Sequence, residues 1–201
     1  MLKEIRPAIV LLVALTLITG VIYPFAMTGI ARVIFPIQSQ GSLVEENGRI
    51  VGSALIGQQF QSDRYFHGRP SATVAPDPND PTKTVPVPYN GANSGGSNLG
   101  PTNKSLIERV QGDMDRLQQE NPSAEVPIDL VTTSGGGLDP HISPAAALFQ
   151  VPRVAKTRNM SEDSVRRLVD EHVEGRTLGI LGEPRVNVLA LNLALDRAAA
   201  H

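Results

Sequence analysis

Residues 8–23 read AIVLLVALTLITGVIY, and no charged residue lies between Arg6 and Arg32. About 20 apolar residues in a helix span the hydrocarbon core of a bilayer, which is roughly 30 Å thick. No later segment is as long and as apolar. The sequence therefore predicts one membrane-spanning helix inside an anchor region of residues 1–36.

The charges beside this segment predict its orientation. Lys3 and Arg6 precede the apolar run, whereas Arg32 is the only cation soon after it. The positive-inside rule then favours a cytoplasmic N-terminus and an extracytoplasmic domain of residues 37–201. A cleaved signal peptide is the alternative, but its apolar region is usually about 7 to 15 residues long. An uncleaved anchor is favoured, with Pro24 predicted to kink the helix or to require a local backbone adjustment.

Composition limits the remaining classes of protein. The 201 residues carry a net charge of -2 and no basic run, which argues against binding to nucleic acid. The chain has no cysteine, so disulfides, iron–sulfur clusters and thiolate zinc sites are excluded. About 160 residues follow the anchor, which is enough for one domain with its own core. With 18 glycines and 16 prolines, much of its surface is predicted to be loops.

Local patterns predict an α+β fold for this domain. Asn47-Gly48 predicts a hairpin or short strand before residues 49–57, and the composition of residues 70–101 predicts a long irregular loop. A helix capped by Ser105 and Glu108 is expected to end at Asn121-Pro122.

A strand is expected next over residues 128–133. A second helix begins at Pro144 and is interrupted or restarted at Pro152, and Ser161 caps a third. Residues 186–196 fit a strand or a helix, and their alanine-rich end favours a helix. The expected fold is one N-terminal transmembrane helix, then a single mixed soluble domain with short strands, three to four helices and long Gly/Pro-rich loops.

No catalytic or metal motif is complete. The segment Gly100–Ser105 lacks the glycine that a phosphate-binding loop places before its lysine. The acidic residues near Asp77 do not have the spacing of a calcium loop. The four histidines, His67, His141, His172 and His201, show no paired-ligand spacing, so no metal site is predicted.

Residues 134–137, Ser-Gly-Gly-Gly, lie between an expected strand and an expected helix, where backbone amides could bind an anion or a partner's carbonyl groups. A simple tight turn also explains them. Ser134, Asp139 and His141 include the residue types of a hydrolytic triad, although they are crowded into one short stretch.

Four longer sequence motifs are more specific than these short patterns. They are YFHGRPSA at 65–72, SGGSNLGPTN at 94–103, DLVTTSGGGLDPHISP at 129–144 and LGEPRVNVL at 181–189. In this order, and with the N-terminal anchor, they resemble the C subunit of the bacterial Kdp high-affinity potassium-transporting ATPase. Gly136 stands where that family often has serine.

The resemblance implies a complex with a channel-like potassium-conducting subunit, a P-type ATPase subunit and a very small membrane peptide. The present sequence contains no Asp-Lys-Thr-Gly phosphorylation motif and no selectivity-filter repeat. It is therefore expected to be a non-catalytic accessory subunit that assembles and stabilises the complex. The family is also described as a catalytic chaperone that raises the affinity of the ATPase subunit for ATP. Direct contact with ATP conflicts with an exported domain, so an indirect effect through the anchor helix is favoured over direct binding. No cofactor is assigned to this chain, and ATP is expected through the complex.

The resemblance also supplies candidate site residues. The loop expected to contact nucleotide or partner comprises Ser134, Gly135, Gly136, Gly137, Asp139 and His141. The residues expected at the partner interface are Tyr65, Phe66, Gly68, Arg69, Pro70, Ser97, Asn98, Asn103, Arg185 and Asn187. Two alternatives remain: a membrane-anchored exported hydrolase using Ser134, Asp139 and His141, and a solute-capturing module built on residues 70–101.

Overall fold

The structure, a computed structural model, describes residues 2–198 and divides between Val51 and Gly52 into two compact units. The first unit holds α1 (Leu2–Leu17), a π-helical turn (Ile18–Ile22), α2 (Tyr23–Ile34), a 3-10 turn (Gln38–Gln40), β1 (Leu43–Glu46) and most of β2 (Arg49–Ser53). The second holds β3 (Val74–Pro76), β4 (Thr84–Pro86), α3 (Lys104–Glu120), a 3-10 turn (Ile128–Leu130), β5 (His141–Ile142), α4 (Pro144–Arg158), α5 (Glu162–Glu171), β6 (Val173–Glu174), β7 (Arg185–Asn187) and α6 (Val188–Ala198). These elements confirm the α+β class.

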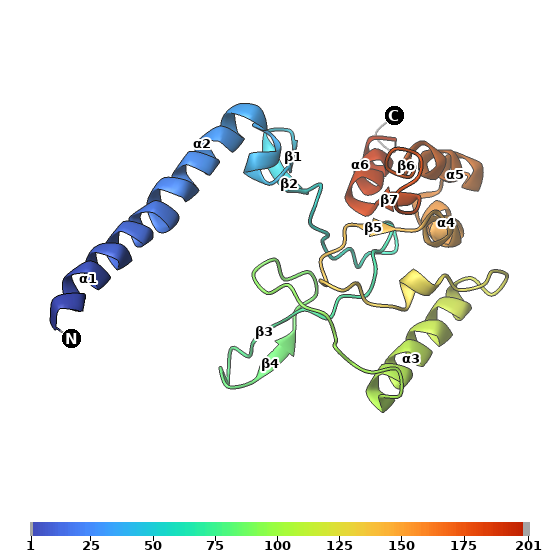
Figure 1. Cartoon of the computed structure of the whole chain (residues 1–201). Coiled ribbons are helices and arrows are strands. Elements are labelled where there is room, and N and C mark those ends of the chain that lie inside the picture. The colour runs from blue at the N-terminus through green and yellow to red at the C-terminus, as the bar shows by residue number, and fades with distance from the viewer. Residues whose placement is uncertain (1, 199–201) are drawn as a thin grey trace. The chain divides into compact units, whose positions relative to one another are not determined.

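The helical part of the first unit is one continuous rod (Figure 1). Residues Lys3–Ile34 are long and apolar enough to cross a membrane, and none of them is buried by the rest of the chain. At about 1.5 Å per residue this helix is roughly 48 Å long, so it is longer than a hydrocarbon core is thick. The π-helical turn directly precedes Tyr23-Pro24, where the backbone must accommodate a proline without an N–H.

The hairpin predicted at Asn47-Gly48 is confirmed. β1 pairs with β2, and both turn residues have positive φ, 52° for Asn47 and 74° for Gly48. Two central residues of positive φ match the right-handed twist of the paired strands, and Asn-Gly is the dipeptide that adopts this conformation most readily.

The core of the second unit lies between its last three helices and a small sheet. α4 packs on α5, α5 packs on α6, and both α4 and α6 contact β7 (Figure 1). The sheet is antiparallel with the strand order β5-β7-β6, so β7 is central. Fully or almost fully buried side chains fill this space, including Ile142, Val151, Val154, Val165, Val169, Val186, Leu191 and Leu195.

Several helix predictions are confirmed. Pro144 occupies the first turn of α4, and the Ser143 hydroxyl accepts from the Ala146 N–H. The Ser161 hydroxyl caps α5 in the same way by accepting from Ser164. Residues 188–198 form the C-terminal helix, although residues 185–187 before it belong to β7.

Three local predictions are wrong. Residues 128–133 do not form a strand: Ile128–Leu130 is a 3-10 turn that follows Pro127, and the Thr132 hydroxyl donates back to the Ile128 carbonyl. Asn103, and not Ser105, caps α3, because the Asn103 side chain accepts from the Ser105 N–H.

The third error concerns Pro152, which neither interrupts nor restarts α4. Val151 and Val154 on either side of it are fully buried. Their packing keeps the helix continuous where local propensity alone would break it.

The expected loop of residues 70–101 is largely irregular, and it contains the two-stranded antiparallel ribbon of β3 and β4. Within the described residues, β3 and β4 pair only with each other.

Candidate functional site

Two buried amide side chains fix the segment that contains the first motif. Asn192 of α6 accepts from the Phe66 N–H at 2.8 Å and donates to the Phe66 carbonyl at 3.0 Å. Gln150 of α4 makes the same pair with His67, at 2.8 and 3.1 Å. Both amides are 1% exposed and Phe66 is fully buried. The two helices thus satisfy an extended segment that has no neighbouring strand.

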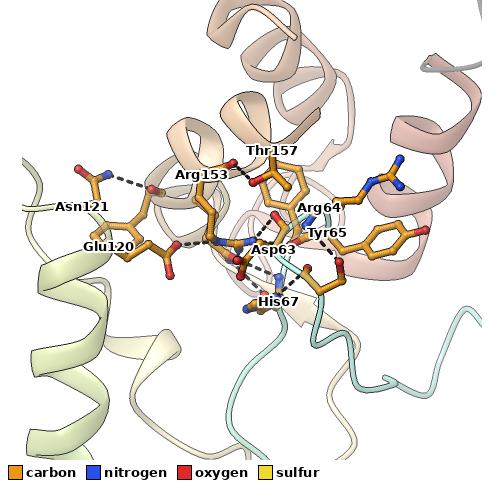
Figure 2. Close-up of polar contacts among 12 residues, drawn as sticks. Asp63, Arg64, Tyr65, His67, Glu120, Asn121, Arg153 and Thr157 are labelled. Carbon is orange, nitrogen blue, oxygen red and sulfur yellow. Dashed lines mark hydrogen bonds and ion pairs between the residues drawn. The ribbon is translucent and has the colours of Figure 1, made fainter. Parts of the chain in front are cut away.

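Two arginines of α4 clamp the same segment. Figure 2 shows Arg153 between Glu120 of α3 and the backbone near His67. Its guanidinium lies 2.7 Å from Glu120 and donates to the carbonyls of Asp63 and Tyr65 at 2.6 and 3.0 Å. Burial, and after it the charge of Arg153, lower the pKa of His67.

The second of these arginines is Arg158, whose side chain is 1% exposed. It pairs with Asp196 at 2.8 Å and lies 4.9 Å from the centre of the Tyr65 ring. The Tyr65 hydroxyl also donates to Asp196, at 3.0 Å. Tyr65 is thus held by α4 and α6.

Arg69 joins the first motif to the third. Its guanidinium lies 3.3 Å from the Asp139 carboxylate and also donates to the carbonyls of Thr132 and Thr133. The other carboxylate oxygen of Asp139 accepts from the His141 N–H and lies 3.3 Å from Nδ1 of that residue. The structure thus brings Arg69, predicted at the partner interface, together with Asp139 and His141, predicted in the loop expected to contact nucleotide or partner.

The glycine loop of residues 134–137 is held by residues of the first and second motifs. The Gly136 carbonyl accepts from the Gly95 N–H at 3.1 Å and from the Ser94 hydroxyl at 3.0 Å. The Gly137 carbonyl accepts from the Ser71 hydroxyl at 2.7 Å. Gly137 has a φ of +67°, and a Cβ there would lie 2.6 Å from the Thr73 methyl group. Close packing of two loops therefore explains this glycine.

Tyr89 lies at the centre of these contacts. Its hydroxyl donates to the Arg69 carbonyl at 2.7 Å. Its ring covers Gly57 and Gly68, where an added Cβ would collide with it. Burial, and after it the charge of Asp139, raise the pKa of Tyr89 to about 12.

Beside this cluster lies an open cleft of about 430 Å³, to which the first, third and fourth motifs all contribute. It is lined by Arg69, Pro127, Ile128, Asp129, Asp139, His141, Ile142, Ser143, Ala145, Glu183, Pro184 and Arg185. The predicted candidates Arg69, Asp139, His141 and Arg185 therefore share one surface.

Each charged side chain of this cleft already has a partner within the chain. Besides the Arg69 cluster, Arg185 pairs with Glu174 at 2.9 Å, and Glu183 pairs with Arg176 at 2.7 Å. Asp129 accepts from both the N–H and the hydroxyl of Ser143. Within residues 2–198, no group of three or more His, Asp or Glu side chains could hold a metal ion.

The other predicted candidates lie elsewhere in the second unit. The side chain of Asn187 accepts from the Ala190 N–H in the first turn of α6 and donates to the Ala54 carbonyl. Pro70 lines a second cleft of about 280 Å³ beside Tyr89. Ser97 is half-buried, Asn98 is exposed, and Asn103 caps α3. Their contact with a partner stays a prediction.

The geometry does not assemble the residues of the hydrolase alternative. Asp139 and His141 are in contact, but Ser134 is 7% exposed. In the described part of the chain, no hydrogen bond joins the Ser134 hydroxyl to His141. A nucleophile must lie within hydrogen-bond reach of its base, so this arrangement does not favour hydrolysis.

The sequence analysis missed two groups of residues. Gln150, Asn192 and Tyr89 were not singled out, because an isolated amide or tyrosine carries no motif. The apolar stretch of residues 177–182, TLGILG, was also missed, although a short apolar run between glycines is a readable signal for an exposed loop.

Comparisons with known proteins identify the family of this chain. Residues 5–197 match the family described as KdpC: K+-transporting ATPase, c chain. The potassium-transporting ATPase KdpC subunit of Bradyrhizobium diazoefficiens is 71% identical over 200 residues, which cover 100% of both chains. The protein of the same name from Rhodopseudomonas palustris strain BisB18 is 71% identical over 198 residues, 98% of this chain and 100% of the relative. The one from Methylobacterium nodulans is 66% identical over 199 residues, 99% of each chain. The chain therefore belongs to the KdpC family, the accessory C chain of the Kdp potassium-transporting ATPase complex.

Proposed function

We propose that this subunit crosses the bacterial inner membrane once and assembles and stabilises the complex from the outer side. Its N-terminus lies in the cytoplasm, and the domain of residues 37–201 lies in the periplasm or extracytoplasmic space. Two features support this topology: the apolar helix of residues Lys3–Ile34, and the cations Lys3 and Arg6 before its uncharged part.

The proposed partners are the channel-like potassium-conducting subunit, the P-type ATPase subunit and the small membrane peptide of the same complex. The observation that carries this proposal is the cleft beside Arg69, whose charged side chains are already paired while Ile128 remains 75% exposed. A surface of neutralised charges around apolar groups suits contact with another protein. It offers no unpaired charge to an ion or a nucleotide.

An influence on ATP affinity is proposed to be indirect. An extracytoplasmic domain lies across the membrane from cytosolic ATP, so coupling passes through the anchor helix. The hydrogen bonds of Gly136 to the second motif and of Gly137 to Ser71 of the first motif support a structural use of the glycine loop.

The absence of cysteine permits a direct test of the topology. Glu4→Cys and Asn79→Cys each introduce one reactive thiol at an exposed position. In intact spheroplasts, a membrane-impermeant maleimide is expected to label Asn79→Cys at once and Glu4→Cys only after permeabilisation. The opposite labelling pattern would overturn the proposed orientation.

A substitution that introduces one bulky cationic side chain tests whether the cleft is a contact surface. Ala145 is exposed and lines the cleft, whereas Ala190 is exposed on α6 and does not line it. We expect Ala145→Arg to lower recovery of this subunit with the complex about tenfold, and Ala190→Arg to leave recovery unchanged. Equal recovery of both variants would exclude the cleft as a contact surface.

A further inference from the structure

An exposed apolar loop connects β6 to β7. Leu178 is 85% exposed, Ile180 74% and Leu181 57%. Single exposed apolar side chains are ordinary, but three within four residues form a patch that needs a physical explanation. This segment, Arg176–Glu183, is called the apolar loop below.

The apolar loop has a defined shape of its own. The N–H of Thr177 donates to the Leu181 carbonyl at 2.9 Å, and the N–H of Leu181 donates back to Thr177 at 3.0 Å. At the base, Arg176 and Glu183 pair at 2.7 Å. These bonds satisfy part of the backbone of the loop internally. Burial of its tip against a partner therefore costs less desolvation free energy.

The backbone conformation is also unusual. Leu178 has a φ of +56°, and Gly179 and Gly182 have φ of +77° and +76°. Positive φ is rare for a bulky residue such as leucine and costs free energy. A strained leucine at an exposed tip indicates that the side chain is presented in a particular direction.

The surroundings of the loop carry little net charge. Arg176 is neutralised by Glu183, and Arg185 by Glu174. The C-terminal end of the loop is continuous with the cleft, because Glu183, Pro184 and Arg185 line it. An apolar centre with a rim of paired charges is the usual anatomy of a protein–protein contact.

We propose that the apolar loop is a preformed docking element that inserts Leu178 and Ile180 into an apolar recess of another subunit of the transport complex. This inference rests on the accessory function and extracytoplasmic location proposed above. A protein recess fits better than a lipid surface for two reasons. The paired rim offers no attraction to anionic lipids, and a fixed loop shape lowers the ordering cost of fitting a shaped recess, which fluid lipid does not require.

Photo-crosslinking in the assembled complex identifies the occupant. A photo-reactive amino acid replaces Leu178, and a second version carries it at Arg167, which is exposed on α5. The expected result is a product between position 178 and another subunit of the complex, with much less product from position 167. Crosslinks from position 178 to lipid alone, or to a second copy of this chain, would overturn the proposal.

Matched variants measure what the loop contributes. Leu178→Glu with Ile180→Glu is compared with Ile107→Glu plus Met114→Glu on α3, where the side chains are 55% and 42% exposed. The first pair is expected to lower retention of this subunit in the detergent-solubilised complex at least tenfold, because the charges oppose burial of the loop. The second pair should leave retention unchanged, and both proteins should unfold at the temperature of the unaltered chain.

A third variant separates shape from hydrophobicity. Gly179→Val adds an apolar side chain but disfavours the φ of +77°. If the loop docks into a shaped recess, Gly179→Val lowers retention of this subunit in the complex. If the loop inserts into lipid, retention stays the same or rises.

The failure of this inference is distinguishable from failure of the proposed function. If the unaltered chain does not purify with the complex, the proposed function fails. If it does, and the Leu178→Glu, Ile180→Glu chain is retained equally well, only the docking role of the loop is excluded.

Discussion

Asn192 shows how one buried side chain can replace a missing strand. Its amide satisfies both the N–H and the carbonyl of Phe66, at 2.8 and 3.0 Å. Asn192→Leu keeps a similar volume but leaves both backbone groups unpaired in the core. We expect a loss of about 2 to 4 kcal/mol in the free energy of unfolding, measured by urea denaturation of the full chain in detergent.

A matched amide is available on the surface for comparison. Gln111 is exposed and donates to Asp115 at 2.7 Å. Gln111→Leu is expected to change stability by less than about 0.5 kcal/mol, because water satisfies the groups that it leaves. Equal losses in the two variants would show that the Asn192 amide does not hold the Phe66 segment.

Tyr89 makes stability depend on alkaline pH. Its pKa is raised from 10.0 to about 12 in the folded chain. Below pH 10 both states keep the proton, whereas between pH 10 and 12 the unfolded chain loses it first, so the stabilisation falls as pH rises. The free-energy difference between the unaltered chain and Tyr89→Phe should therefore shrink by about 2 kcal/mol across this window. A difference that stays constant with pH contradicts the burial of the phenol.

At the scale of elements, the glycine loop offers an internal control. Gly137 has a φ of +67° and lies against Thr73 and the Gly95 carbonyl, whereas a Cβ at Gly135 would meet no atom within 4 Å. We expect Gly137→Ala to cost about 2 to 4 kcal/mol in chemical denaturation, and Gly135→Ala less than about 0.5 kcal/mol. If both substitutions are neutral, the two loops do not pack as closely as described.

The same scale shows how far the sequence could predict the fold. The Asn47-Gly48 hairpin, the helix start at Pro144, the Ser161 cap and the C-terminal helix follow from short-range signals, and the structure confirms them. The expected strand at residues 128–133 fails, because an apolar run does not reveal whether a partner strand exists. α4 continues through Pro152 because buried valines on either side outweigh the local cost.

At the scale of the whole molecule, the four longer sequence motifs predicted the candidate site better than the spacing patterns of catalytic and metal sites did. Asp139 and His141 were named in one loop, and Arg69 and Arg185 among the partner-interface residues, and the fold gathers the two sets on one cleft. No spacing rule joins a residue at position 69 to one at position 139. Their proximity depends on tertiary packing, including the buried amides of α4 and α6 that hold Phe66 and His67. The apolar loop differs, because its short apolar run between glycines was a local signal that the sequence analysis did not use.

The anchor helix gives the last prediction. Leu15 lies in the uncharged part of Lys3–Ile34, and Val33 lies near its C-terminal end. Leu15→Lys should reduce the fraction of chain that resists alkaline extraction from membranes, because a central charge costs about 2.5 to 3.5 kcal/mol on insertion scales. Val33→Lys should be nearly neutral, since a lysine near the interface extends its ammonium group to water. The apolar helix does not span the bilayer as assigned if Leu15→Lys is retained as well as Val33→Lys.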